Sequence, residues 1–242
     1  MIIKKINAKE DRREAHRSLL LFFSGWGMDE HPFMEYLPFD RDCMICYDYR
    51  SLAFDESLLA PYRHIRIVAW SMGVWAASRI LSGLHSRITE SIAINGTQWP
   101  VDDERGIAKA VFYGTLEGLN EETLQKFRRR MCGSKDTLGR FMEHAPRRTV
   151  ESLREELEQI AEFSSESHTS SIGNHLPCVR NYSSSVESSS SSFVWNKVYV
   201  GLYDKIFLPA NQRKAWEGEN IIMAECEHYP STLWNELFGK PV

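Results

Sequence analysis

Three residues of this 242-residue chain have the types and the chain order that acyl transfer by a serine nucleophile requires. That chemistry needs a serine, a histidine that accepts its proton, and a carboxylate that orients the histidine. Ser71 has a small residue two positions before it, Ala69, and a glycine two positions after it, Gly73. Asp204 and His228 follow later, each soon after an apolar run. The pattern predicts cleavage of an ester or thioester through an acyl-enzyme.

The residues around Ser71 predict a sharp turn between a strand and a helix. The apolar run at 64–68 precedes the turn, and apolar residues recur after it at helical spacing, up to Leu84. Small neighbours let other backbone segments approach a serine that is held in a strained conformation. This is the nucleophile-elbow pattern, with alanine in place of its first glycine. The alternative is a buried serine at an ordinary turn between a strand and a helix.

The predicted acid and base both come where parallel strands end. Asp204 follows the apolar run that ends at Gly201, and His228 follows the run at 221–224. The chain order of serine, acid and histidine is the one that goes with this elbow. His228 is the one histidine of eight that follows the last predicted strand. Asp204 is the preferred acid, while Asp102 and Asp103, after the fourth predicted strand, remain alternatives.

Acyl transfer also needs N–H donors for the negatively charged oxygen of the tetrahedral intermediate. The backbone N–H of Met72, directly after the serine, is the first expected donor. The second is the N–H of Trp26, in a loop after the first long predicted strand, where Gly25 and Gly27 permit a tight turn. The Trp26 indole is also placed to wall an acyl pocket. A purely structural role for this loop is the alternative.

Strand-like and helical patterns alternate along the chain, which is typical of a parallel sheet covered by helices on both faces. We expect an α/β-hydrolase core formed by residues 1–105 and 193–242, with a mostly parallel, twisted sheet. The predicted strands are Ser18–Phe23, Cys43–Tyr47, Ile65–Ala69, Ser91–Ile94, Val194–Val200 and Ile221–Ala224. Predicted core helices follow Ser71 and cover Ala210–Trp216 and Leu233–Leu237.

The segment 106–163 has helical patterns but no convincing strand. Predicted helices cover Glu121–Met131, Asp136–His144 and Thr149–Phe163. A helical insertion over the carboxyl end of a parallel sheet would form a lid above the site, and the alternative is a peripheral helical subdomain. Residues 164–192 are rich in serine and predict an irregular loop.

Composition narrows the classes of function. The net charge of −4 disfavours general nucleic-acid binding. No apolar run is long enough to cross a membrane, and the first residues lack a signal-peptide pattern, so we expect a cytoplasmic protein. Cys43 and Cys46 have C-x-x-C spacing, but they lie in an apolar run without a second ligand pair. Buried structural thiols are therefore favoured over a metal or redox site, and no metal is expected.

With these residues in place, the chain resembles the BioG-type pimeloyl-[acyl-carrier protein] methyl ester esterases. The resemblance implies an esterase of biotin synthesis that releases methanol from the carrier-bound methyl ester, with Ser71 as nucleophile, His228 as base, Asp204 as acid and no cofactor. Residues 164–192 depart from the family pattern. The matching stretches are Phe23–Gly27, Cys46–Tyr49, Tyr62–Arg66, Val68–Trp75, Asn95–Thr97, Ala110–Leu116, Asp204–Phe207, Pro209–Gln212 and Glu227–Tyr229.

The implied partner is an acyl carrier protein, which is acidic, and one segment has the opposite charge. Between positions 121 and 148 there are eight Lys or Arg residues and four acids, which is a net +4. This asymmetry suits docking of an acidic partner. The alternative is a solvated helix face balanced by nearby acids at 151, 155 and 156. The candidate docking residues are Arg128, Arg129, Arg130, Arg147 and Arg148.

Overall fold

The computed structural model describes residues 1–8, 18–81, 87–169 and 193–240. Seven strands form one sheet in the order β1-β3-β2-β4-β5-β6-β7, and every neighbouring pair is parallel except β1 with β3. This is the mostly parallel sheet expected from the sequence. The strands are β1 (Ile2–Ile6), β2 (Ser18–Phe23), β3 (Asp42–Tyr47), β4 (His64–Trp70), β5 (Ile88–Ile94), β6 (Lys197–Gly201) and β7 (Ile221–Ala224).

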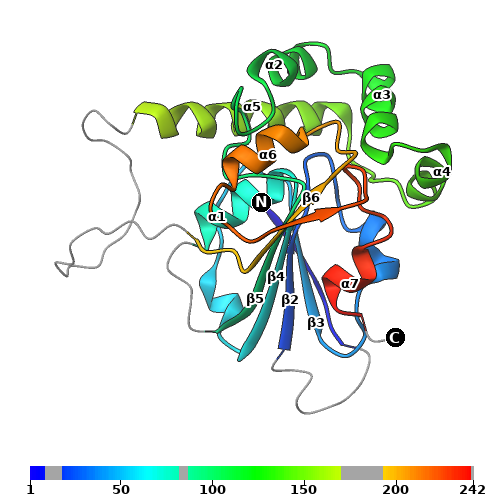
Figure 1. Cartoon of the computed structure of the whole chain (residues 1–242). Helices are drawn as coiled ribbons and strands as arrows, with labels where there is room; N and C mark the ends of the chain where they lie inside the picture. The colour runs from blue at the N-terminus through cyan, green and yellow to red at the C-terminus, as the bar shows by residue number, and fades with distance from the viewer. Residues whose placement is uncertain (9–17, 82–86, 170–192, 241–242) are drawn as a thin grey trace.

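Strand β2 shows why this sequence forms a central strand. Successive side chains on a strand point to opposite faces, so both faces of a buried strand must be apolar. Leu19, Leu21 and Phe23 join the hydrophobic cluster on one face, and Leu20 and Phe22 join the cluster on the other. The first cluster includes side chains of α1 (Met72–Ile80), and the second includes those of α7 (Trp234–Phe238). Figure 1 shows these two helices on opposite sides of the strands.

The helices between β5 and β6 lie beyond one end of the sheet, at the top of Figure 1. This helical insertion confirms the three predicted helices and adds one, α2, before them. A capping box between Asn120 and Thr123 starts α3, and Ser134 caps α4. No helix in the described ranges is long and apolar enough to cross a bilayer. The helices are α2 (Lys109–Glu117), α3 (Glu121–Cys132), α4 (Lys135–Glu143) and α5 (Val150–Thr169), with α6 (Pro209–Ala215), η2 (His31–Tyr36) and η3 (Glu56–Leu59) elsewhere.

The observed elements differ from the predicted ones at several places, and three of the differences have a clear physical reason. The edge strand β1 was not expected, because its two lysines break the apolar pattern and its pairing depends on the free edge of β3. Strand β6 begins at Lys197 rather than Val194, which is 61% exposed. Helix α5 continues to Thr169, six residues into the serine-rich segment that was predicted to be irregular. There Ser164 donates to the carbonyl of Ile160 four residues earlier, which satisfies its hydroxyl within the helix. Residues 170–192 lie outside the described ranges.

The C-x-x-C pair lies on β3 and is split between the two faces of the sheet. Residues three apart on a strand point in opposite directions. Cys43 accordingly packs in one hydrophobic cluster and Cys46 in the other, and both thiols are fully buried. Two such thiols cannot bind one metal ion or form a disulfide without breaking the strand. The interpretation as structural thiols therefore fits the geometry.

Burial also predicts that these thiols are unreactive in the native protein. Burial raises the pKa of Cys43 to about 12, that of Cys132 to about 12 and that of Cys226 to about 11, and it raises the pKa of Cys46 as well. Since the thiolate is the nucleophile, alkylation by iodoacetamide at pH 8 should be at least about a hundredfold slower than in the unfolded chain. Peptide mass spectrometry measures each cysteine separately. Labelling of Cys43 at the unfolded rate would contradict a buried β3.

Candidate active site

Ser71 lies at the turn between β4 and α1 with φ of 59° and ψ of −127°, a backbone conformation that is strained for a residue with a Cβ. Close packing around this turn requires glycine at two positions that lie next to it in space. A Cβ at Gly73 would lie 2.2 Å from the carbonyl oxygen of Phe23, and a Cβ at Gly96 would lie 2.2 Å from that of Ser71. Ala69 is fully buried as well. The close packing predicted around the serine is therefore present.

Of the three predicted residues of the acyl-transfer site, His228 lies within hydrogen-bond distance of both Ser71 and Asp204. His228 Nε2 is 2.9 Å from Ser71 Oγ, and His228 Nδ1 is 2.9 Å from Asp204 Oδ2 and 3.0 Å from Oδ1. His228 is 1% exposed and Asp204 2%. A carboxylate can only accept, so Nδ1–H donates to Asp204 and Nε2 is left to accept the serine proton.

Other groups also hold Asp204. Its Oδ1 accepts from the backbone N–H of Ile206 at 2.8 Å and of Phe207 at 3.0 Å, and its Oδ2 accepts from Gln212 Nε2 at 3.0 Å. The ring of Phe207 stacks parallel to that of His228. These donors compensate for the burial of a carboxylate and orient it toward the imidazole.

The carboxylates of the two alternative acids accept other hydrogen bonds. Asp102 accepts from the N–H groups of Glu104 and Arg105 and pairs with the Arg105 side chain. Asp103 accepts from the N–H of Lys109, at the start of α2. Both residues stabilise the turn after β5, and neither contacts His228. Of the three candidate acids, Asp204 is the one that reaches the histidine.

Two residues that sequence reasoning left without a role hold the histidine loop. Asn95 donates to the carbonyls of Glu227, at 2.8 Å, and His228, at 3.0 Å, and accepts from the N–H of Gly201 at 2.7 Å. Asn95 therefore links the loop that contains His228 to the end of β6, the strand that precedes Asp204. Trp70 Nε1 also donates to the His228 carbonyl, at 2.7 Å. The position of Asn95, directly after a buried parallel strand, could have pointed to it.

The two expected oxyanion donors lie beside the serine. A Cβ on Gly25 would come within 3.1 Å of Ser71 Cβ, so the loop after β2 passes next to the nucleophile. Among the residues that the structure describes, neither the Trp26 N–H nor the Met72 N–H donates a hydrogen bond. Unpaired N–H groups are uncommon in a buried region, and here they leave two donors for a ligand.

A pocket opens between these groups and the helical insertion, and Ser71 and His228 are part of its wall. It contains about 550 Å³ of empty space, part of which is open to solvent. Two cations, Arg130 and Lys205, also line it. Its apolar wall is formed mainly by Trp26, Ile107, Val111, Phe112, Phe127, Met131, Leu157 and Ile206.

The five arginines predicted to dock a partner divide into two groups. Arg129, Arg130 and Arg147 are exposed. Arg128 is only 7% exposed, and the Arg148 side chain is 9% exposed and paired with Asp48 and Glu156. The expectation of a surface role for these last two is wrong, because one lies on the inner face of α3 and the other neutralises buried acids. Arg148 is balanced by one of the nearby acids named in the alternative, Glu156, but in a buried pair rather than on a solvated helix face.

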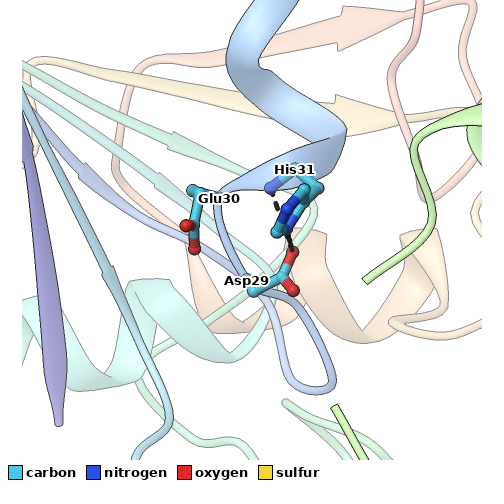
Figure 2. A group of neighbouring side chains, drawn as sticks. All are labelled: Asp29, Glu30 and His31. Atoms are coloured by element: carbon cyan, nitrogen blue, oxygen red, sulfur yellow. Dashed lines mark hydrogen bonds and ion pairs between the residues drawn. The ribbon is translucent and has the colours of Figure 1, made fainter. Parts of the chain in front are cut away.

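Among the described residues, one cluster brings together side chains of the kinds that bind metals: Asp29, Glu30 and His31. Figure 2 shows Asp29 beside His31, with the Glu30 carboxylate set apart to one side. Asp29 accepts from the backbone N–H groups of His31, at 3.0 Å, and Arg147, at 2.8 Å. Glu30 binds Lys4 and the Tyr47 hydroxyl. The cluster thus anchors the loop after β2 to the helical insertion and to the edge of the sheet.

Solved structures with similar folds include enzymes of the α/β-hydrolase class. BioG from Haemophilus influenzae is 33% identical, with a TM-score of 0.76 and 97% of each chain covered. A hydrolase from Pseudomonas aeruginosa PA01 has a TM-score of 0.59 at 12% identity, covering 98% of this chain and 90% of that one. At that identity the likeness concerns the fold alone. The fold of this chain is the expected α/β-hydrolase fold.

Sequence comparison gives a relative and a family. A Bacteroides fragilis (strain 638R) protein named malonyl-[acyl-carrier protein] O-methyltransferase is 53% identical over 227 residues. The match covers 93% of this chain but only 41% of that protein. The family model described as pimeloyl-ACP methyl esterase BioG matches residues 7–236. This chain therefore belongs to the BioG family.

Proposed function

We propose that this protein is a serine carboxylesterase that removes the methyl group from pimeloyl-[acyl-carrier protein] methyl ester. The observation that carries the proposal is the hydrogen-bonded series Ser71, His228 and Asp204 in the wall of an apolar pocket. The family description supplies the substrate. No step requires a cofactor, and the reaction would take place in the cytoplasm.

In the proposed mechanism, Ser71 Oγ attacks the ester carbonyl while His228 Nε2 takes its proton. The new oxyanion accepts hydrogen bonds from the N–H groups of Trp26 and Met72. Asp204 stabilises the imidazolium, which then protonates the leaving methoxide and releases methanol. Water attacks the acyl-enzyme with His228 as base, which leaves the free carboxylate of the acyl chain and restores Ser71.

The pocket suits the alkyl part of an acyl chain. Its wall is largely apolar, so burial of methylene groups favours binding by about 0.8 kcal/mol for each group. Arg130 and Lys205 add positive charge to the wall. An acyl chain with a methyl-capped end avoids placing a charged carboxylate in the apolar part of the pocket, where an unpaired charge is costly.

The name of the Bacteroides fragilis relative suggests a different reaction, methyl transfer to malonyl-[acyl-carrier protein]. This chain matches 41% of that protein, so its name describes a longer chain. The matched region here contains the hydrogen-bonded serine, histidine and aspartate of acyl transfer. We infer that this region contributes ester hydrolysis rather than methyl transfer.

Mass spectrometry of the carrier-bound substrate tests the proposal. Incubation with pimeloyl-[acyl-carrier protein] methyl ester should release methanol and convert the ester to the acid while the acyl chain stays on the carrier. Ser71→Ala protein is the control.

Release of free carrier would indicate a thioesterase. Cleavage of small esters alone would indicate a general carboxylesterase. Failure to react with a fluorophosphonate probe would indicate a non-catalytic binding protein. Methylation of malonyl-carrier protein in the presence of S-adenosylmethionine would support the methyltransferase.

The docking of an acidic carrier protein gives a separate prediction. Arg129 and Arg147 are exposed and do not line the pocket. Changing both to glutamate should lower the rate on carrier-bound ester at least about tenfold, or about 1.4 kcal/mol. The rate on a small ester should change by less than about threefold, because that substrate enters without a partner. The carrier-dependent rate should also fall with added salt, as screening shortens the range of attraction.

Arg63→Glu is the matched control, since Arg63 is exposed and precedes β4, at the opposite end of that strand from Ser71. It should leave both rates unchanged. Equal losses on both substrates in the double variant would mean that the two arginines support the helical insertion. No loss on either substrate would place the docking surface elsewhere.

A further inference from the structure

Glu156 is a fully buried carboxylate in the helical insertion that takes no part in the proposed proton transfers. Its Oε1 accepts from the backbone N–H of Tyr49 at 2.9 Å. Its Oε2 accepts from Arg148 Nη1 at 2.5 Å and from the N–H of Gly27 at 3.5 Å. Arg148 pairs in turn with Asp48 at 3.2 Å. One side chain of α5 therefore contacts the loops after β2 and after β3.

Stability alone does not explain a charge at this position. Removing an ion pair from water is costly, and apolar residues of similar volume often serve as well or better. What Glu156 contributes must therefore be sought in the groups that it contacts. Of these groups, Gly27 directly follows the predicted oxyanion donor, Trp26, and Tyr49 contacts the segment that precedes it.

The chain is held on both sides of Trp26. Gly27, directly after it, donates to Glu156. Before it, the carbonyl of Ser24 accepts from the Tyr49 hydroxyl at 2.7 Å, and Tyr49 is itself bound to Glu156 through its backbone N–H. The two ends of this short turn are thus attached, directly or through one residue, to the same carboxylate.

A third contact holds Trp26 itself. Its indole Nε1 donates to the carbonyl of Leu153 at 2.9 Å, and Leu153 precedes Glu156 by three residues on α5. Two residues three apart on a helix share a face. The same face of α5 therefore binds the indole of the predicted donor and the peptide that follows it.

We propose that Glu156, neutralised by Arg148, is a positioning residue for the Trp26 N–H of the oxyanion hole. The inference rests on the proposed serine-hydrolase function. It gives the helical insertion a role in the chemical step, beyond that of covering the pocket. Glu156 touches none of the reacting atoms and acts through the loop that it holds.

The expected effect is on kcat rather than on KM. An oxyanion donor acts where charge develops in the transition state, and loss of one donor costs about 100- to 1,000-fold in kcat. A donor that is displaced rather than removed should cost less. We expect at least about a tenfold fall in kcat for Glu156→Gln, with KM within about twofold, because ground-state contacts in the pocket are retained.

The test measures three properties of Glu156→Gln on a small ester substrate. The first is the split between kcat and KM. The second is the affinity for a trifluoromethyl ketone, whose tetrahedral adduct on Ser71 places an oxyanion in the hole. This affinity should fall by the same factor as kcat/KM. The third is the backbone N–H resonance of Trp26 by NMR, which should shift. Glu155→Gln is the matched control, since Glu155 is an exposed neighbour that pairs with Arg50 at the surface.

Tyr49→Phe is a second variant in case Glu156→Gln folds poorly, because it removes one hydroxyl and leaves no charge unpaired. It should lower kcat in the same way. An unchanged kcat and an unchanged Trp26 resonance in both variants would overturn the proposal. Turnover of small esters without turnover of the carrier-bound ester would contradict the proposed substrate only. If the wild-type protein cleaves no ester, the Trp26 resonance still decides whether Glu156 positions this loop.

Discussion

Replacing Ser71 by alanine is expected to leave a folded protein whose esterase rate is at least about a thousandfold lower. Ser71 Oγ lies 2.9 Å from His228 Nε2, and within the described site no other hydroxyl has that place. Without it the acyl-enzyme cannot form, and only the donors and the pocket would favour attack by water. Initial rates on a small ester and on the carrier-bound ester measure the loss.

Circular dichroism should show the same fold for this variant, because alanine is smaller than serine and accepts the same strained backbone. A fluorophosphonate probe should label the wild-type protein and not the variant. Turnover within about tenfold of the wild-type rate would remove Ser71 from the mechanism.

Asp204→Asn is expected to lower kcat by about 1,000- to 10,000-fold, with little change in KM. The carboxylate accepts from His228 Nδ1, from two backbone N–H groups and from Gln212. An amide keeps the shape but adds a donor where acceptors are needed. The imidazole would then lose the partner that fixes its tautomer and stabilises its positive form.

Asp102→Asn and Asp103→Asn are the matched controls, since both aspartates were alternative acids and both lie in the turn after β5. Each variant should retain activity within about threefold of wild type. Its free energy of unfolding should fall only slightly. If one of these variants is inactive while Asp204→Asn still turns over, the acid has been assigned to the wrong residue.

Patterns that arise within one element were predictable. The central strands are recognisable because β2 and β3 are apolar at nearly every position, as burial on both faces requires. The helix after Ser71 has apolar residues at helical spacing. The edge strand β1 was missed because a strand with one exposed side and two lysines lacks any such pattern, and only its partner β3 defines it.

Serine-rich composition misled for a related reason. Composition predicts the conformation that a segment adopts when it packs against no other element. Residues 164–169 instead continue α5, whose earlier turns bury Leu153, Leu157 and Ile160 in the core. A helix that is already formed extends at little further cost, because nucleation is the costly step.

The order of serine, acid and histidine, and their positions at strand ends, can be read from the amino-acid sequence, because parallel strands bring their carboxyl ends to one edge of the sheet. The folded chain brings Asp204, the preferred candidate, to the histidine and holds Asp102 and Asp103 in other bonds, and it turns Arg128 and Arg148 inward. It also brought Glu156 to the Trp26 loop, 129 residues away from Gly27 in the chain. These contacts depend on which side chains of distant segments meet in the folded chain, and local periodicity in the sequence does not predict such contacts.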